Sequence, residues 1–372
     1  MSVTQRARRF VEALAAHHPV PTTGPTPSAV IEATRLTRAG RLTEAMTVLQ
    51  GAGGAPTGVF PTMPGSFPTM RGTVPTMPGA FRAGARATGP DPTSGRVSRG
   101  SVTGAGGTRS YRLVVPTQPQ DRPPLMVMLH GGTQDAETFA AATGMDDLAE
   151  QEGFVVVYPE QSRSANAMGY WNWFEPAHQG RHGEAALIAA VISEVSAAHG
   201  VDRDRVFVAG FSAGAAMAAV LGAAYPDLVA GVGIHSGLPA GSARDVGSAF
   251  AAMRGAPYRA AATDVPTIVI HGSDDPTVAA VNGTRAVEAA LADRPGCAHT
   301  VEHGHGGRDW TRESWTDRDG IVRAEHWTVH GSGHAWSGGR AGGSYTDPAG
   351  PDASAAMVRF AQVSRNPRSD TD

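Results

Sequence analysis

Residues 205–225 read RVFVAGFSAGAAMAAVLGAAY, and this stretch decides the fold. The apolar run at 205–209 predicts a buried strand, and the alanine-rich run at 213–225 predicts a helix. Between them lies Gly210-Phe-Ser-Ala-Gly214, a G-x-S-x-G turn that carries a serine at the carboxyl end of the strand. Small residues at both ends of the turn let strand and helix approach closely. Ser212 is therefore the candidate nucleophile, and the alternative is a tight turn without a chemical role.

Strand-like and helix-like segments alternate on both sides of this turn, which indicates an α/β fold with a mostly parallel sheet flanked by helices. The pattern predicts strands at residues 125–129, 154–158, 205–209, 231–234 and 266–270. It predicts helices at residues 136–152, 184–199, 213–225 and 352–363. Residues 310–315 and 321–329 flank a polar turn, so we expect a hairpin whose second strand joins the sheet.

The chain divides by composition into four parts. Residues 1–55 include a helical pattern at 28–50, and residues 56–103 are rich in Gly and Pro. In this second part FPTM, FPTM and VPTM recur with a period of seven residues from Phe60, which favours an extended tether. The alternative is a docking peptide for a partner, a granule or a polymer surface. We expect the catalytic domain at 104–364 and a disordered tail at 365–372.

Charge and composition exclude several classes of protein. With 31 basic and 34 acidic residues the net charge is -3, so no basic surface for nucleic acid is expected. The single cysteine, Cys297, excludes an intramolecular disulfide. The sequence contains no run of about 20 apolar residues, so it predicts no membrane span. The N-terminus as written has no apolar run of signal-peptide length, which favours the cytoplasm but leaves the compartment open.

A serine hydroxyl needs a base within hydrogen-bond reach and a group that orients the base. Residues 268–278, IVIHGSDDPTV, predict a buried strand that ends in a polar turn with two carboxylates. Asp275 is the preferred orienting group because hydrolases of this fold carry the acid at that place in an HGxxDxxV spacing. Asp274 is the alternative, as a turn residue.

The base is expected in the loop GSGHAWSGG, residues 331–339. His334 lies there, after a strand and downstream of both Ser212 and Asp275, which gives the chain order serine, aspartate, histidine. His326 and His330 alternate on the strand itself, so we expect them to be sheet residues.

The sequence HGGTQ at 130–134 follows a predicted strand and is similar to loops that supply an oxyanion donor. The Gly132 amide is preferred and Thr133 is next, with the Ala213 amide as second donor. Each such donor is worth about 10²- to 10³-fold in rate. His130 and Gln134 are alternatively turn-stabilising residues. His299, His303 and His305 lack the spacing of a metal site, so we expect neither metal nor cofactor.

Several motifs together resemble the polyhydroxybutyrate depolymerase family of esterases, over residues 111–360. They are HGGTQ (130–134), YPEQSRSAN (158–166), WNWF (171–174), GFSAG (210–214), HSGLP (235–239), HGSDDPTV (271–278), GSGHAWSGG (331–339) and GSYTDPAGPDAS (343–354). The resemblance implies an α/β-hydrolase fold and cofactor-free hydrolysis of short-chain polyhydroxyalkanoate or related esters by Ser212, Asp275 and His334. Feruloyl and acetylxylan esterases share much of the pattern, so they remain an alternative. A serine peptidase and a non-catalytic granule-binding module are further alternatives.

Two departures from the family pattern stand out. Family members commonly carry a cysteine at the place of Gly132, and secreted members carry an export signal that this sequence lacks as written. Trp171 and Trp173 are expected to line the ester groove, with packing under a loop as the alternative. Trp336, two residues beyond His334, and Thr133 are further candidates for substrate contact.

Overall fold

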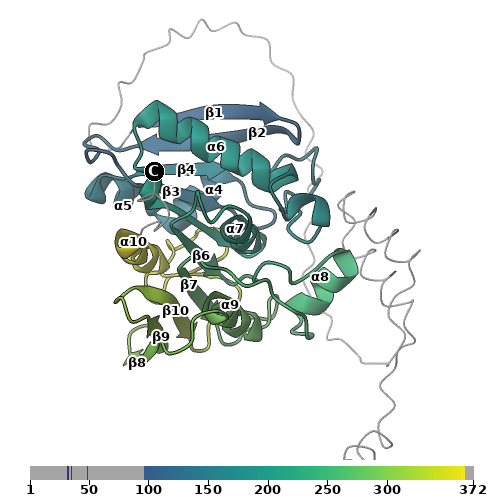
Figure 1. Cartoon of the computed structure of the whole chain (residues 1–372), viewed down its shortest axis with the longest axis vertical. Helices are drawn as coiled ribbons and strands as arrows, with labels where there is room; N and C mark the ends of the chain where they lie inside the picture. Colours follow the sequence, from purple (N-terminus) through teal and green to yellow (C-terminus); the bar gives the residue numbers. More distant parts are fainter. Residues whose placement is uncertain (1–31, 33–34, 36–47, 49–95, 365–372) are drawn as a thin grey trace, which may run out of the picture.

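The computed structural model describes residues 96–364, together with residues 32, 35 and 48. A ten-stranded sheet runs through residues 96–329 in the order β1-β2-β4-β3-β5-β6-β7-β10-β9-β8 (Figure 1). The strands are β1 (Arg96–Gly104), β2 (Gly107–Val115), β3 (Leu125–Leu129), β4 (Val155–Pro159), β5 (Val206–Phe211), β6 (Gly231–His235), β7 (Thr267–Gly272), β8 (Ala298–Gly304), β9 (Trp310–Thr316) and β10 (Val322–Val329).

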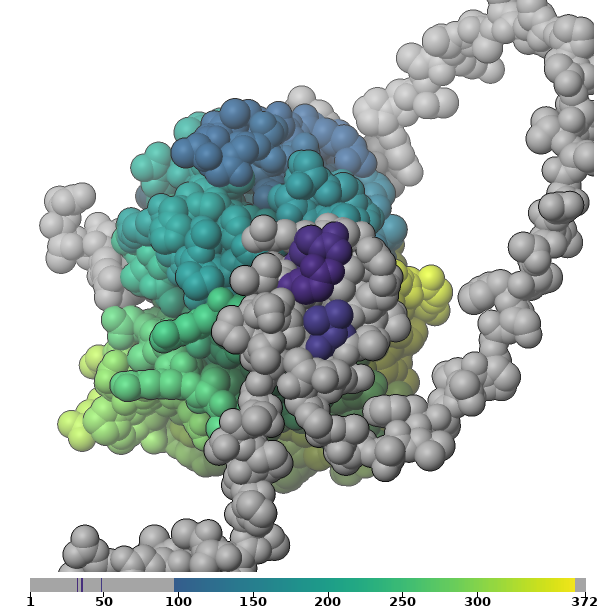
Figure 2. Space-filling model, turned by 90° about the vertical axis from the view of Figure 1, so that its right-hand side faces the viewer, coloured from purple at the N-terminus to yellow at the C-terminus, as the bar shows by residue number. Residues whose placement is uncertain are grey.

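The centre of the sheet is parallel and its edges are antiparallel. Strands β4, β3, β5, β6, β7 and β10 pair in parallel, β1 and β2 add antiparallel strands at one edge, and β9 and β8 do so at the other. The space-filling view shows the blue first strands at one end of the domain and the light-green last strands at the other (Figure 2). Every residue of β3 to β7 is buried, as expected for parallel strands covered on both faces.

Helices cover both faces of the sheet and enclose two hydrophobic cores. One core takes its helical side chains from α4 (Ala136–Thr143), α5 (Met145–Glu152) and α10 (Ala353–Val363). The other takes them from α6 (Gly183–His199), α7 (Ala213–Ala224), α8 (Val246–Met253) and α9 (Val281–Leu291). Two short strands, β11 (Trp336–Ser337) and β12 (Thr346–Asp347), pair beyond the end of β10. This mostly parallel sheet with helices on both faces is an α/β-hydrolase fold.

The structure confirms the predicted central strands and the hairpin whose second strand joins the sheet, where β10 pairs in parallel with β7. The predicted helix at 136–152 is two helices, because Gly144 adopts a left-handed φ of 64° between them. The predicted boundary at 104 is wrong. Strand β1 lies in the segment that was expected to be linker, and residues 104–107 form the turn of the β1–β2 hairpin.

Some expectations fall on residues outside the described part of the chain. The helical pattern at 28–50, apart from residues 32, 35 and 48, is among them, as are the FPTM repeats and the tail at 365–372. Within the described residues, no helix is both long and apolar enough to cross a bilayer.

Candidate active site

Ser212 lies on a sharp turn between β5 and α7. Its φ of 55° and ψ of -118° are a backbone conformation that costs a non-glycine residue about 1–3 kcal/mol, which the surrounding packing must hold in place. The neighbouring glycines explain how this packing is possible. A Cβ at Gly210 would lie 2.4 Å from the Gly214 carbonyl carbon, and a Cβ at Gly214 would lie 2.1 Å from the Leu129 carbonyl oxygen. The turn thus has no room for larger residues, and β3 lies directly beside it.

The structure brings the three predicted triad residues into hydrogen-bond contact. His334 Nε2 lies 3.0 Å from Ser212 Oγ, and His334 Nδ1 lies 2.7 Å from Asp275 Oδ2. The other oxygen, Asp275 Oδ1, accepts the amides of Thr277 and Val278 at 2.8 Å each. An imidazole between a hydroxyl and a carboxylate is arranged to take the hydroxyl proton.

The neighbouring carboxylate faces elsewhere. Asp274 is exposed, and its Oδ1 accepts a hydrogen bond from the Ser273 hydroxyl at 2.7 Å. Of the two candidate orienting groups, the geometry therefore favours Asp275.

The environment keeps the Asp275 carboxylate ionised. Burial by itself raises the pKa of this group, but hydrogen bonds from His271, His334 and the Val278 amide outweigh burial and hold the pKa well below its usual range. The nearby His235 is buried under the turn, where it accepts the Ser337 amide at Nε2 at 2.9 Å. Burial, followed by repulsion from His271 and His334, lowers the pKa of His235 well below its ordinary value. His235 is therefore neutral.

Two backbone amides are available for an oxyanion. Ala213 is the first residue of α7, so its amide lies at the positive end of the helix. Among the described residues, neither the Ala213 nor the Gly132 amide donates to a protein acceptor. The Thr133 amide is already taken, because it donates to the Met168 carbonyl at 3.1 Å. The geometry therefore favours the Gly132 and Ala213 amides as oxyanion donors. The Thr133 side chain is exposed, so it is free to contact a substrate.

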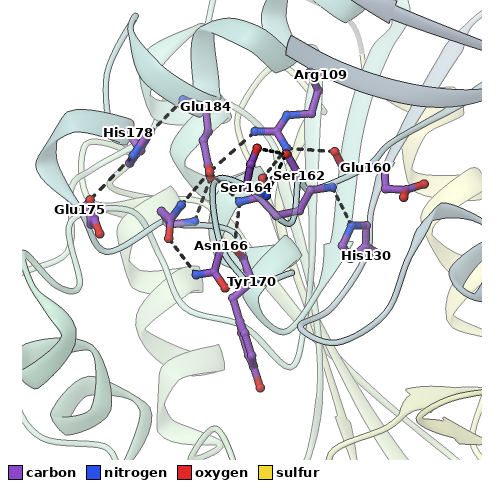
Figure 3. A network of polar contacts seen from close by, with 12 residues as sticks. Arg109, His130, Glu160, Ser162, Ser164, Asn166, Tyr170, Glu175, His178 and Glu184 are labelled. Carbon is purple, nitrogen blue, oxygen red and sulfur yellow. Dashed lines mark hydrogen bonds and ion pairs between the residues drawn. The ribbon is translucent and has the colours of Figure 1, made fainter. Parts of the chain in front are cut away.

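A buried polar network holds the oxyanion loop from behind (Figure 3). His130 Nε2 accepts the Gln161 amide at 3.1 Å, and the His130 carbonyl accepts Trp171 Nε1 at 2.9 Å. The Gln161 side chain donates to Glu184 Oε1 at 2.6 Å and is hydrogen-bonded to Arg109. Burial lowers the pKa of His130 to about 4, so the ring is neutral and its Nε2 remains an acceptor. His130 thus fixes the loop, as its alternative interpretation held.

The three tryptophans do not line an open groove. Trp171 and Trp336 are 0% and 1% exposed, and Trp173 is 5% exposed. The Trp171 indole is hydrogen-bonded to the His130 carbonyl, and the Trp336 indole donates to Ser354 Oγ at 3.1 Å while its ring stacks on His235. The prediction of substrate contact is wrong for all three, since protein atoms cover the rings. They support the site from inside the core.

Two tyrosines that the sequence did not single out lie at the site instead. Tyr345 is 48% exposed, and its ring centroid lies 6.4 Å from that of His334. It has a left-handed φ of 53°, held in place where its carbonyl accepts the Trp336 amide at 2.7 Å. The half-buried Tyr170 covers Gly132, where an added Cβ would lie 2.1 Å from its ring. The only sequence signal was the presence of Tyr345 in the motif GSYTDPAGPDAS, because Tyr170 lies just before WNWF and outside every quoted motif.

The histidines that were considered as metal ligands do not converge. His299 contacts Glu313, His303 contacts Thr311 and His305 contacts Asp309, all on the exposed surface of the β8–β9 hairpin and its turn. No group of three His, Cys, Asp or Glu side chains in the described residues is arranged to hold a metal ion.

The fold and this serine, histidine and aspartate define an α/β hydrolase. Within that class, the chain belongs to the esterase PHB depolymerase family, whose model matches residues 109–294. It is 34% identical over 254 residues to poly(3-hydroxyalkanoate) depolymerase C of Paucimonas lemoignei, covering 62% of this chain and 59% of that protein. It is 32% identical over 168 residues to probable acetylxylan esterase A of Aspergillus fumigatus, covering 44% of this chain and 45% of that protein.

A solved structure shares the fold. Acetyl xylan esterase from Aspergillus awamori aligns with a TM-score of 0.53 and 22% identity over 64% of this chain and 94% of that chain. The chain spans less than two thirds of the length of the two relatives named above.

Proposed function

We propose that this protein is a serine esterase that hydrolyses short-chain polyhydroxyalkanoate, such as polyhydroxybutyrate, or related esters through an acyl-enzyme on Ser212. The observation that carries the proposal is the position of His334, whose two ring nitrogens contact the Ser212 hydroxyl and the Asp275 carboxylate. Membership of an esterase family supports the reaction class, and a depolymerase among the relatives supports the substrate.

The first half-reaction acylates the serine. His334 Nε2 takes the Ser212 proton while Oγ attacks the ester carbonyl, and the Gly132 and Ala213 amides hold the resulting oxyanion. The imidazolium is stabilised by Asp275, which stays negative because its pKa is held low. When the carbon–oxygen bond breaks, His334 passes the proton to the leaving alcohol.

The second half-reaction releases the acid. Water gives a proton to His334 Nε2 and attacks the acyl carbonyl, a second oxyanion forms, and Ser212 Oγ leaves with that proton. The same residues therefore serve both steps, and no redox change occurs. The backbone strain at Ser212 helps, because it presents Oγ at the carboxyl end of β5.

Tyr345 and Tyr170 are proposed to contact the substrate. The Tyr345 ring borders the His334 ring and is half-exposed. It therefore offers an aromatic face and a hydroxyl to the part of the substrate next to the scissile bond. Tyr170 lies against the loop that carries Gly132 and narrows the site on that side.

The deciding experiment compares wild type with Ser212→Ala on amorphous polyhydroxybutyrate, p-nitrophenyl butyrate and methyl ferulate. We expect wild type to clear the polymer and to cleave the nitrophenyl ester, and the variant to do neither. Polymer left intact by a wild-type enzyme that cleaves the small esters would refute the depolymerase proposal and keep the triad. A peptide anilide is the control for the peptidase alternative.

A carbohydrate esterase is the second candidate function. The relatives include acetylxylan esterases, and the structure of one shares the fold. Release of acetate from acetylated xylan, or of ferulate from methyl ferulate, at a higher kcat/KM than for a hydroxybutyrate trimer would favour it.

The FPTM repeats are proposed to adsorb the protein to a polyester granule or polymer surface. Each repeat carries a large apolar residue and a methionine in a Pro-rich setting. Deletion of residues 56–82 is expected to weaken adsorption to granules and to leave p-nitrophenyl butyrate turnover unchanged. Equal adsorption of both forms would contradict this role.

A further inference from the structure

A second histidine besides His334 lies beside the Asp275 carboxylate. His271 is the second-to-last residue of β7. Its Nε2 donates to the Val278 carbonyl at 2.8 Å. The same nitrogen lies 3.5 Å from Asp275 Oδ2, the oxygen that also accepts His334 Nδ1. His271 therefore closes the Asp275–Val278 turn at its end and borders the oxygen that orients the base.

The other nitrogen of His271 faces a third histidine. His271 Nδ1 and His326 Nε2 are both buried and without a hydrogen-bond partner among the described residues. A Cβ at Gly283 would lie 3.2 Å from the first and 3.0 Å from the second, so the two nitrogens converge on one point beside α9. Buried polar atoms without partners are rare and call for a reason. For His271, the reason is that Nε2 contacts the Val278 carbonyl and Asp275 Oδ2. These contacts fix the ring and leave Nδ1 without a partner.

We propose that His271 is a positioning residue for the triad, which holds the Asp275 turn and shares the carboxylate oxygen with His334. His326 backs the ring from β10. This inference rests on the proposed function, because it assigns work to Asp275 as the group that orients His334. It adds a residue that touches neither substrate nor the reacting hydroxyl.

The positioning role has an electrostatic consequence. While His271 donates toward Asp275 Oδ2, part of the negative charge that faces His334 is shared. Removal of that donor leaves the carboxylate to His334 alone, and the imidazolium is then favoured. The titratable groups beside His271 are Asp275, His235 and His326, and His334 shares the Asp275 Oδ2 oxygen with it. Burial lowers the pKa of His235 and of His326, the latter to about 4, and keeps both neutral in the assay range.

The pH profile of kcat/KM is therefore a readout that a merely structural role of His271 would not move. Glu313, whose Oε2 lies 4.0 Å from His326 Nδ1, is the only carboxylate of the described residues in ion-pair range of that ring, and it faces the side away from the triad. Loss of the His271 donor is expected to shift the acid limb to higher pH by at least 0.3 unit, a two-fold change in proton affinity.

The test compares His271→Ala, His271→Gln and the control His303→Ala, in the full chain, with p-nitrophenyl butyrate. The amide nitrogen of glutamine can replace Nε2 as donor to Val278, whereas alanine cannot. We expect His271→Ala to lose about 10- to 100-fold in kcat with KM within two-fold, because a misplaced group costs on this order. We expect His271→Gln to recover most of that loss, and His303→Ala, on the exposed hairpin, to behave as wild type.

Three results would overturn the inference. The first is a folded His271→Ala protein whose kcat and acid limb equal those of wild type. The second is a His271→Gln protein that is as impaired as His271→Ala and has an unshifted acid limb. The third applies if neither variant folds: nitrogen-15 NMR of wild type then determines the tautomer of His271, and a proton on Nδ1 alone refutes the inference, which requires a proton on Nε2. Inactive wild type, with Ser212→Ala indistinguishable from it, would instead refute the proposed function.

Discussion

Asp275→Asn is expected to abolish most of the activity because the structure dictates how the new amide must lie. Asp275 Oδ1 accepts two backbone amides, from Thr277 and Val278, so the asparagine must place its oxygen there. Its NH2 group then faces His334 Nδ1, which is 2.7 Å from Oδ2 in the wild type. His334 must accept that hydrogen bond at Nδ1 and carry its proton on Nε2. In that tautomer it cannot take the Ser212 proton.

The expected magnitude follows from this tautomer. The corresponding substitution in a serine protease triad lowers kcat by about 10⁴-fold with the geometry intact. A loss of about 10⁴ corresponds to about 5 kcal/mol in the activation free energy. The assay is kcat for p-nitrophenyl butyrate, with thermal unfolding of each variant to show that the fold is kept.

Asp274→Asn is the matched control. The side chain is the adjacent carboxylate, is exposed and contacts only the Ser273 hydroxyl among the hydrogen bonds of the described residues, so we expect kcat within about two-fold of wild type. Retention of more than a tenth of the activity by Asp275→Asn, or a larger loss in Asp274→Asn, would refute the assignment of the orienting carboxylate.

Three further predictions concern the walls of the site and the buried network behind the 130–134 loop. Gly132→Ala places a methyl group against the Tyr170 ring, too close for both to keep their places, so the loop must move. The kcat for p-nitrophenyl butyrate is then expected to fall about 10²-fold, and an unchanged kcat would contradict the oxyanion role of the Gly132 amide. Tyr345→Ala is expected to lower kcat/KM for a hydroxybutyrate trimer at least five-fold more than for p-nitrophenyl acetate, and an equal loss on both would argue against substrate contact. Glu184→Gln leaves Arg109 buried without its charge partner and is expected to lower the unfolding free energy by about 3 kcal/mol in a urea titration; a loss below about 1 kcal/mol would show that the hydrogen bonds alone hold the network.

The edge strands show where sequence patterns fail for the fold. The central strands were predictable because each is an apolar run buried on both faces. Strand β1, RVSRGSVTG, and strand β8, AHTVEHG, are mostly exposed edge strands without an apolar alternation. Their strand conformation depends on pairing with β2 and β9, which local sequence does not encode.

The sequence by itself determined the elbow at Ser212 and the order in which Asp275 and His334 follow it, because a strand, a turn of small residues and a helix are local features. The tertiary structure decided what surrounds them. His334 meets residues 122 and 59 positions away, and the Trp171 indole meets a carbonyl 41 positions away. Burial of an aromatic ring and the neighbours of a histidine depend on such long-range packing. For this reason the tryptophans proved to be core residues, and the roles proposed for Tyr345 and His271 emerged only from the folded chain.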